Sequence, residues 1–202
     1  MNTISLKGTL TNIQPSHTIK DIIYDKADLI VHREDGKEDI INLRFKRYSN
    51  PYEISETEGK EISLVGNVRS YSTQVSEDKN KVQIYVFTYF DKPEYDDVIN
   101  EFEIDGRICK MNELRETSNG RINLHFILAN NLIVQNSNQK LNAYLPCIAW
   151  GSTAKALSQL SVNDRIQIKG ELHSREYKKI LSTGEVEIRV AHELLVTSFI
   201  EL

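Results

Sequence analysis

The sequence predicts an all-β protein made of two similar five-stranded barrels in tandem. Two patterns of alternating apolar residues, each interrupted by a glycine, occur once in each half of the 202-residue chain. The first is Ile4, Leu6, Gly8 and Leu10, repeated as Phe102, Ile104, Gly106 and Ile108; the second is Ile62, Leu64, Gly66 and Val68, repeated as Ile166, Ile168, Gly170 and Leu172. Such runs are typical of half-buried strands that bend sharply at the glycine. The length suffices for two domains of about 100 residues each, so one small β-fold is expected twice.

We expect the two domains to cover residues 1–91 and 99–202, with an acidic linker at 92–98. The formal net charge of the chain is −4, and residues 91–98 carry −3 of it, so each domain is close to neutral. A neutral domain still binds polyanions when its cations gather on one face. The placement of the cations on the strands therefore matters more than their number.

Alternating apolar residues and turn residues predict five strands in each half. In the first half the strands lie at 3–12, 22–32, 37–47, 60–72 and 81–91, with a hairpin turn at Asp35-Gly36. In the second half they lie at 100–109, 121–131, 141–150, 163–177 and 184–200, with turns at 118–120 and 182–184.

A short helix is expected between the third and fourth strands of the second half. There Ala154, Leu157 and Leu160 follow helical spacing behind Ser152, a candidate N-cap. The first half has only residues 49–58 at this point, with weak periodicity, which predicts a loop or a single turn. Five strands with a connector between the third and fourth are the layout of an OB-fold barrel, so two tandem OB-folds are predicted.

OB-folds bind oligonucleotides across the second and third strands and stack bases on aromatic side chains. On the third strand of the second half, small or apolar residues suit the barrel interior: Ala143, Leu145, Cys147 and Ala149. The alternate residues then point outward: Tyr144, Pro146, Ile148 and Trp150. Tyr144 and Trp150 are about 20 Å apart along the strand, so they would meet different bases. The alternative is that Trp150 covers the end of the barrel next to the helix.

The fourth strand of the second half and the hairpin after it interleave cations with a tyrosine. Cations on a flexible hairpin can hold phosphates while the ring stacks on a base; a solvated basic hairpin is the alternative. The candidate nucleic-acid contacts of this half are Tyr144, Trp150, Tyr177, Arg107, Arg121, Lys155, Lys169, Arg175, Lys178 and Lys179.

Basic side chains dominate the candidate contacts of the first half, where Phe45 has the parity of a core residue. These contacts are Arg44, Lys46, Arg47, Tyr48, Arg69 and Tyr71. The final strand is apolar on both faces, so Tyr85, Phe87 and Tyr89 would form an exposed stripe. Such a stripe more often marks a protein interface than a ligand site, and we expect it to pack against a domain or subunit.

The sequence gives no support for an enzyme, a metal site or a membrane protein. It contains no P-loop, dinucleotide-binding, zinc-protease or nucleophile-elbow motif, and its five histidines fall at no metal-ligand spacing. No run approaches the roughly 18 apolar residues of a membrane span, and no signal-peptide pattern is present. Cys109 and Cys147 stand alone. We expect a non-enzymatic, cytoplasmic protein with free thiols and no cofactor.

Three separated motifs, at 100–110, 145–151 and 173–177, resemble the bacterial single-stranded-DNA-binding proteins. More narrowly, the chain resembles a tandem-OB branch whose first domain carries a Gly-x-x-Arg-Ser-Tyr run, matched here at 66–71. The resemblance covers essentially the whole chain. It implies binding of single-stranded DNA (ssDNA) without strong sequence preference.

The resemblance also implies that Tyr144, Trp150 and Tyr177 occupy base-stacking positions, whereas a further stacking position falls near Val134, which is not aromatic. Family oligomers bring together four OB-folds, so a homodimer is expected. The expected location is the cytoplasm, in association with the nucleoid. The chain ends in a strand-like run at 195–202, so recruitment of partners through a disordered acidic tail is not expected.

Two functional hypotheses follow. The first is a sequence-tolerant ssDNA-binding protein that coats and protects unwound strands in replication, recombination or repair. The second is an OB-fold adaptor, such as a primosome or mobile-element accessory factor, that binds nucleic acid weakly. Oligonucleotide affinity separates the two.

Overall fold

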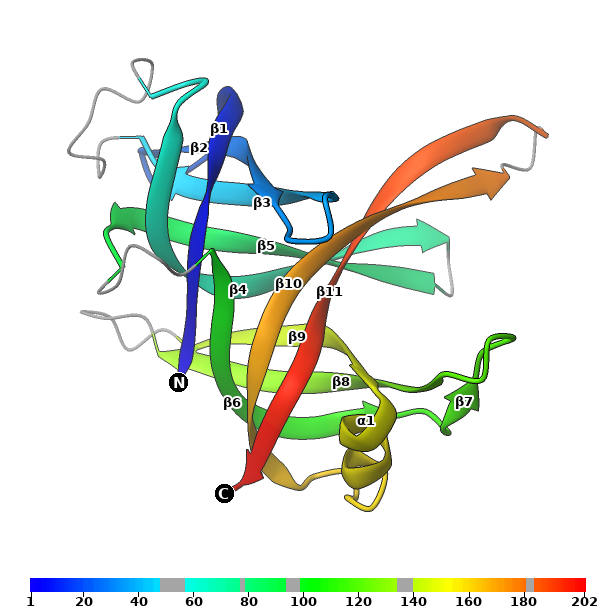
Figure 1. Cartoon of the computed structure of the whole chain (residues 1–202). Helices are drawn as coiled ribbons and strands as arrows, with labels where there is room; N and C mark the ends of the chain where they lie inside the picture. Colours follow the sequence, from blue (N-terminus) through cyan, green and yellow to red (C-terminus); the bar gives the residue numbers. More distant parts are fainter. Residues whose placement is uncertain (48–56, 77–78, 94–98, 134–139, 181–183) are drawn as a thin grey trace.

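The computed structural model of the chain consists of β-strands and one short helix (Figure 1). It describes residues 1–47, 57–76, 79–93, 99–133, 140–180 and 184–202. The strands of the first half are β1 (Asn2–Ile19), β2 (Ile22–His32), β3 (Glu38–Lys46), β4 (Glu61–Ser76) and β5 (Lys79–Asp91). The elements of the second half are β6 (Asn100–Met111), β7 (Arg115–Glu116), β8 (Ile122–Ile133), β9 (Lys140–Trp150), α1 (Gly151–Leu157), β10 (Arg165–Ile180) and β11 (Val186–Glu201).

Each half closes into a five-stranded barrel, as predicted. In the first half β1 pairs with both β2 and β4, β2 pairs with β3, and β5 joins β3 to β4. In the second half β6 pairs with both β8 and β10, β8 pairs with β9, and β11 joins β9 to β10. The β3–β5 and β9–β11 pairs are parallel and the other pairs are antiparallel. The two circuits have the same connectivity, which confirms the tandem OB-fold prediction.

The repeated glycines lie where one strand serves two neighbours. Gly66 and Gly170 sit at register shifts of β4 against β5 and of β10 against β11. A Cβ on Gly170 would overlap the carbonyl oxygen of Leu195, and a Cβ on Gly106 would lie 2.6 Å from that of Ala129. Glycine is needed because the neighbouring backbone approaches too closely for a side chain. The apolar partners of these glycines in both patterns are buried in the core, with Ile62 only partly so.

The structure differs from the prediction in several local features. β1 runs to Ile19 rather than to about residue 12, because Asn12 takes a left-handed conformation at a bulge and the strand continues. The candidate N-cap Ser152 is wrong: α1 begins at Gly151 and Trp150 holds the cap position without a side-chain hydrogen bond. The two-residue strand β7 was not predicted. The expected loop at 49–58 falls mostly outside the described residues.

Three features join the two barrels. β1 pairs with β6 in antiparallel register from Asn2 opposite Ile104 to Leu6 opposite Asn100. Most of the proposed linker at 92–98 lies outside the described residues. The second feature is the hydrogen bond of 2.8 Å that the Tyr144 amide of β9 donates to Ser70 Oγ of β4. The third feature is the β10–β11 arm, residues 171–180 and 186–193, in which the two strands pair only with each other (Figure 1).

The arm contacts the first barrel at β3. Asp39, buried on β3, accepts hydrogen bonds from Arg33 and from the Ser174 amide of the arm, at 2.6 and 2.5 Å. The Ile40 amide donates to Ser174 Oγ at 2.8 Å, and His192 Nε2 lies 2.7 Å from the Ile40 carbonyl oxygen. Polar contacts from both strands of the arm therefore fix it on the edge of the first barrel. In the described part of the chain, no helix is long and apolar enough to cross a membrane.

Candidate nucleic-acid interface

The end of β9 carries an aromatic ring beneath a cation. Trp150 is partly buried, and the Arg121 guanidinium carbon lies 4.7 Å from the centroid of its ring. The pairing of β8 with β9 explains the contact, because Asn123, two residues after Arg121, is the register partner of Trp150. A guanidinium over a tryptophan face is a favourable cation–π arrangement, and it leaves the cation exposed to solvent.

The parity predicted for β9 is confirmed with one exception. The predicted interior residues are all buried: Ala143, Leu145, Cys147 and Ala149. Tyr144 points outward with 47% of its surface exposed. Ile148 is the exception: it has the outward parity but is buried, with 6% of its surface exposed, and its register partners are His125 of β8 and Leu195 of β11.

The first barrel gathers cations and rings on β3, β4 and β5. The Arg44 guanidinium carbon lies 4.5 Å from the ring centroid of Tyr71 and 4.4 Å from that of Tyr85. The Arg69 guanidinium carbon lies 3.8 Å from the ring centroid of Phe87, and burial lowers the pKa of the Arg69 guanidinium. The predicted bare aromatic stripe is therefore covered in part by arginines of the same barrel: Phe87 is 4% exposed, and Tyr89 remains exposed.

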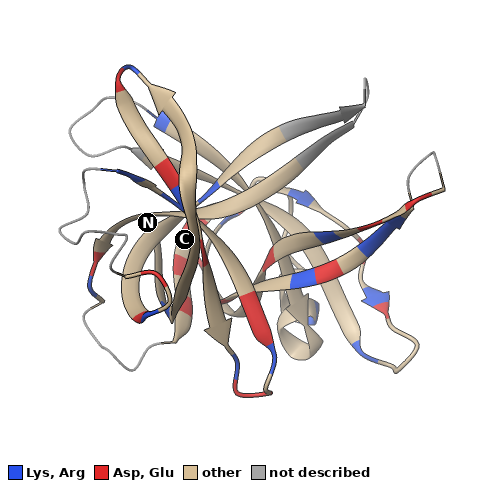
Figure 2. Ribbon diagram, turned by 90° about the horizontal axis from the view of Figure 1, so that it is seen from above, with Lys and Arg blue, Asp and Glu red and all other residues tan. Residues whose placement is uncertain are grey.

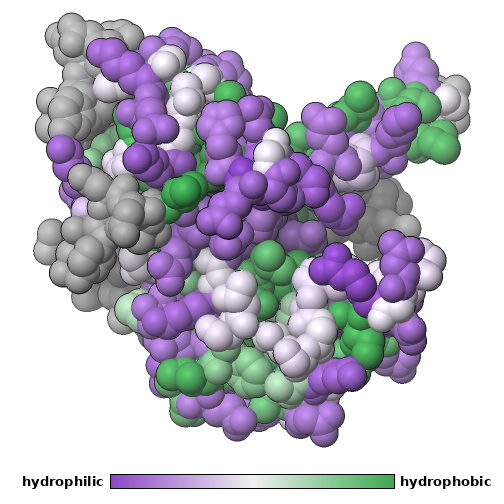
Figure 3. Space-filling view, viewed as in Figure 1, coloured by the Kyte–Doolittle hydropathy of each residue, from purple (hydrophilic) through white to green (hydrophobic). Residues whose placement is uncertain are grey.

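The arm carries the remaining predicted hairpin residues. Along it, Lys and Arg are interspersed with Asp and Glu (Figure 2), and Arg175 forms a 3.5 Å ion pair with Glu193. Tyr177 is the register partner of Arg189, and Lys178 is exposed. The outer part of the arm also exposes apolar side chains (Figure 3), namely Ile180, Val186 and Ile188. Lys179 is partly buried.

Several predicted contacts lie apart from these clusters. The Arg107 side chain donates to the Asn163 carbonyl oxygen at 2.9 Å, and Lys169 pairs with Glu103 at 3.4 Å. Arg47 donates to both carboxylate oxygens of Asp25, which is buried. Lys155 is exposed on α1, Lys46 is partly buried at the end of β3, and Tyr48 lies outside the described residues.

Sequence reasoning missed residues that complete the first-barrel cluster. Tyr85 was expected only as part of an interface stripe, and its ring also contacts Arg44. Lys26 is exposed on β2, beside buried Ala27, and its alternation with that core residue was an available signal. His192 comes from the other barrel, and no local pattern could have placed it there. Within the described ranges, no group of three His, Cys, Asp or Glu side chains could hold a metal ion.

Comparison with known proteins agrees with this architecture. Residues 99–196, which span the second barrel up to the last residues of β11, match the sequence model described as the single-strand binding protein family. The chain as a whole is similar in structure to the wild-type single-stranded DNA binding protein from Thermus aquaticus, with a TM-score of 0.72 and 18% identity, covering 100% of this chain and 93% of that one. A deletion and point mutant of the Thermus protein gives a TM-score of 0.71 and 18% identity, covering 100% and 94%. No curated protein sequence matches the chain.

Proposed function

We propose that the chain binds ssDNA with little sequence preference and coats unwound strands in replication, recombination or repair. The observation that carries the proposal is that both barrels place a guanidinium against aromatic rings on their outer face, Arg121 on Trp150 and Arg44 on Tyr71 and Tyr85. Rings stack on any base and cations neutralise phosphates, so neither feature selects a sequence. The match of residues 99–196 to the single-strand binding protein family model supports the proposal.

Trp150 provides the direct test, because it is the only tryptophan of the chain. Titration with oligo-dT of about 30 nucleotides, roughly twice the largest site of one OB-fold, should quench its emission. Replacing Trp150 by alanine should weaken binding by about 1–3 kcal/mol, the usual value of one stacked base, as measured by fluorescence anisotropy of a labelled oligomer.

Arg121→Ala removes the cation and leaves the Trp150 ring, so it tests the contribution of the cation alone. It should weaken binding and lower the slope of log K against log salt concentration by about 0.7 if one phosphate contact is lost. Lys110→Ala, which removes an exposed cation of the same barrel, is the control and should change neither. Oligo-dT that leaves Trp150 emission unchanged, with affinity no better than about 10⁻⁴ M, would overturn the proposal.

We further propose that two copies associate and present four barrels. The support is the family resemblance and the apolar side chains that the arm exposes, Ile180, Val186 and Ile188. Sedimentation equilibrium should give twice the chain mass of 23.2 kDa. Ile188→Lys should shift the mass toward that of one chain; a wild-type mass of one chain at high concentration contradicts the dimer.

A further inference from the structure

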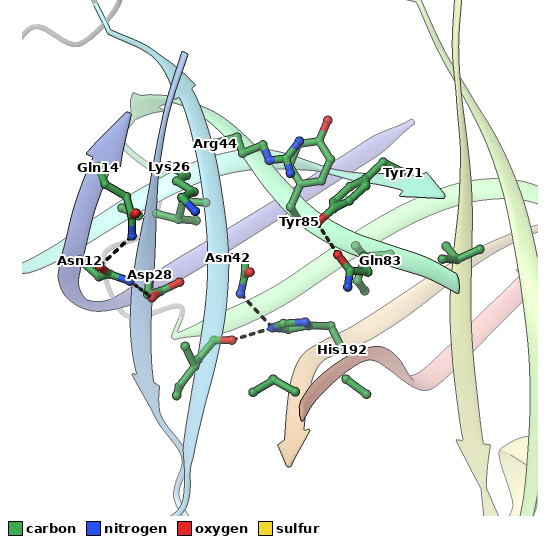
Figure 4. A pocket seen from close by; sticks show the side chains of 17 residues that line it. Asn12, Gln14, Lys26, Asp28, Asn42, Arg44, Tyr71, Gln83, Tyr85 and His192 are labelled. Atoms are coloured by element: carbon green, nitrogen blue, oxygen red, sulfur yellow. Dashed lines mark hydrogen bonds between the residues drawn. The ribbon is translucent and has the colours of Figure 1, made fainter. Parts of the chain in front are cut away.

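A cavity of about 500 Å³ lies where the two barrels meet (Figure 4). We call it the junction cavity. Most of its lining comes from β1–β5 of the first barrel, and one side comes from Val190, Ala191 and His192 of the arm. It is therefore a composite site that neither barrel forms alone.

One side of the junction cavity is formed by a cation packed against two neighbouring rings. The Tyr71 and Tyr85 ring centroids lie 5.9 Å apart, and Arg44 contacts both rings. The Tyr71 hydroxyl donates to Gln83 Oε1 (Figure 4). Tyr71 is 38% exposed, so its ring is accessible from the solvent side. Lys26 adds a second cation to the lining, and Asp28 adds a carboxylate that accepts a hydrogen bond from Asn12 at 2.8 Å. Rings and cations in one cavity suit a ligand that is both planar and anionic.

The other sides carry amide groups. Asn12, Gln14, Asn42 and Gln83 all line the junction cavity. Asn12 donates to Asp28 and accepts from Gln14, and Gln83 Oε1 accepts from Tyr71. An amide side chain offers both donors and acceptors, so the groups that these bonds do not use can pair with the edge of any base. The lining thus combines stacking surfaces with hydrogen-bonding groups that do not discriminate strongly among bases.

The position of His192 leaves an amide donor for a ligand. Its Nε2 lies 2.7 Å from the Ile40 carbonyl oxygen and must carry a proton to donate there. The same nitrogen lies 3.4 Å from Asn42 Nδ2 and then cannot accept a hydrogen bond from it. Asn42, which is exposed on β3, therefore keeps its amide donor for another acceptor.

We propose that the junction cavity holds one nucleotide of a bound ssDNA strand, which passes from the first barrel to the arm of the second. The base would lie against Tyr71 and Tyr85, its edge would face the amides, and Arg44 and Lys26 would meet the adjoining phosphates. The inference deepens the proposed function and rests on it. It adds that His192, on the second barrel, shapes a nucleotide site on the first.

Photocrosslinking tests the placement. Oligo-dT of about 30 nucleotides with 5-iododeoxyuridine at one position, moved along the strand in a set of oligomers, is irradiated with the full chain. Mass spectrometry of the digest should find crosslinks in the peptides that contain Tyr71 or Tyr85. His192→Ala should lower their yield several-fold, whereas His32→Ala, which changes an exposed histidine outside the cavity, should not.

Affinity gives a second measurement. Arg44→Ala should weaken binding of the 30-mer about tenfold, with Lys110→Ala, the exposed cation already used as a control, changing it less than twofold. If oligo-dT quenches Trp150 but yields no crosslink at Tyr71 or Tyr85, the junction site is wrong and the proposed function stands. If oligo-dT neither binds nor quenches, both are overturned.

Discussion

Replacing Gly170 by alanine should lower the free energy of unfolding by about 3 kcal/mol or more, because the methyl group has no space. Its Cβ would overlap the Leu195 carbonyl oxygen and lie 2.9 Å from the carbonyl carbon and 3.1 Å from the Thr197 amide nitrogen. All three atoms are backbone, so relief requires β10 and β11 to separate at the register shift between Lys169 and Gly170. Urea unfolding followed by circular dichroism measures the loss.

Gly36→Ala is the control for the general effect of losing a glycine. Gly36 has a φ of +79° and open space around its Cα, so alanine there meets only the cost of a left-handed conformation, about 1–2 kcal/mol. The contrast isolates steric overlap from conformational freedom. An unfolding midpoint for Gly170→Ala no lower than that of Gly36→Ala would mean that the strands do not approach as closely as the structure has them.

The repeated glycines also explain why the fold could be predicted from the sequence. Neighbouring backbone approaches Gly8, Gly66, Gly106 and Gly170 too closely for a side chain. Gly8 and Gly106 mark one corner of each barrel, and Gly66 and Gly170 mark another. The alternation around them follows directly from the two-residue period of a strand. Fold, strand order and the interior of β9 depend on such local patterns, and these were the predictions that the structure confirmed.

The contacts between the barrels could not be predicted in this way. Asp39 on β3 meets Ser174 on β10 because the arm extends beyond its own barrel, which depends on where pairing with β6 ends. The junction cavity brings Asn12 together with His192 across nearly the whole chain. The Arg44–Tyr85 contact depends on the register between β3 and β5. Local periodicity carries no information on these placements.

Asp39 should be the ionisable residue on which the attachment of the arm depends most. Its side chain is fully buried and accepts hydrogen bonds from Arg33 Nε and Nη2, both at 2.6 Å, and from the Ser174 amide. His173 Nδ1 lies 3.1 Å from Oδ2. Burial alone would raise the pKa of Asp39, but the contacts with His173, Arg33 and Ser174 outweigh it and lower the pKa from 3.8 to about 2.

The lowered pKa fixes the sign of the pH dependence. A carboxylate with a lower pKa in the folded state stabilises the fold at pH values above its unfolded pKa, and this contribution is lost as the pH falls from about 4 to about 2. The contribution at neutral pH is about 2 kcal/mol. Asp39→Asn should remove it and flatten the acid limb of a plot of unfolding free energy against pH.

Asp39→Ala should cost more, about 3–5 kcal/mol, because it leaves the Arg33 guanidinium without its buried partner. The matched control is Asp25→Ala, which breaks the comparable bidentate pair with Arg47 inside the first barrel. Both variants lose stability, but only Asp39→Ala should free the arm, seen as faster hydrogen exchange at the Ile40 and Ser174 amides than in Asp25→Ala at equal global stability. Equal exchange in the two variants would mean that the arm is held without Asp39. Faster exchange would mean that a single buried carboxylate fixes the second barrel's arm, and with it His192, against the nucleotide site proposed on the first.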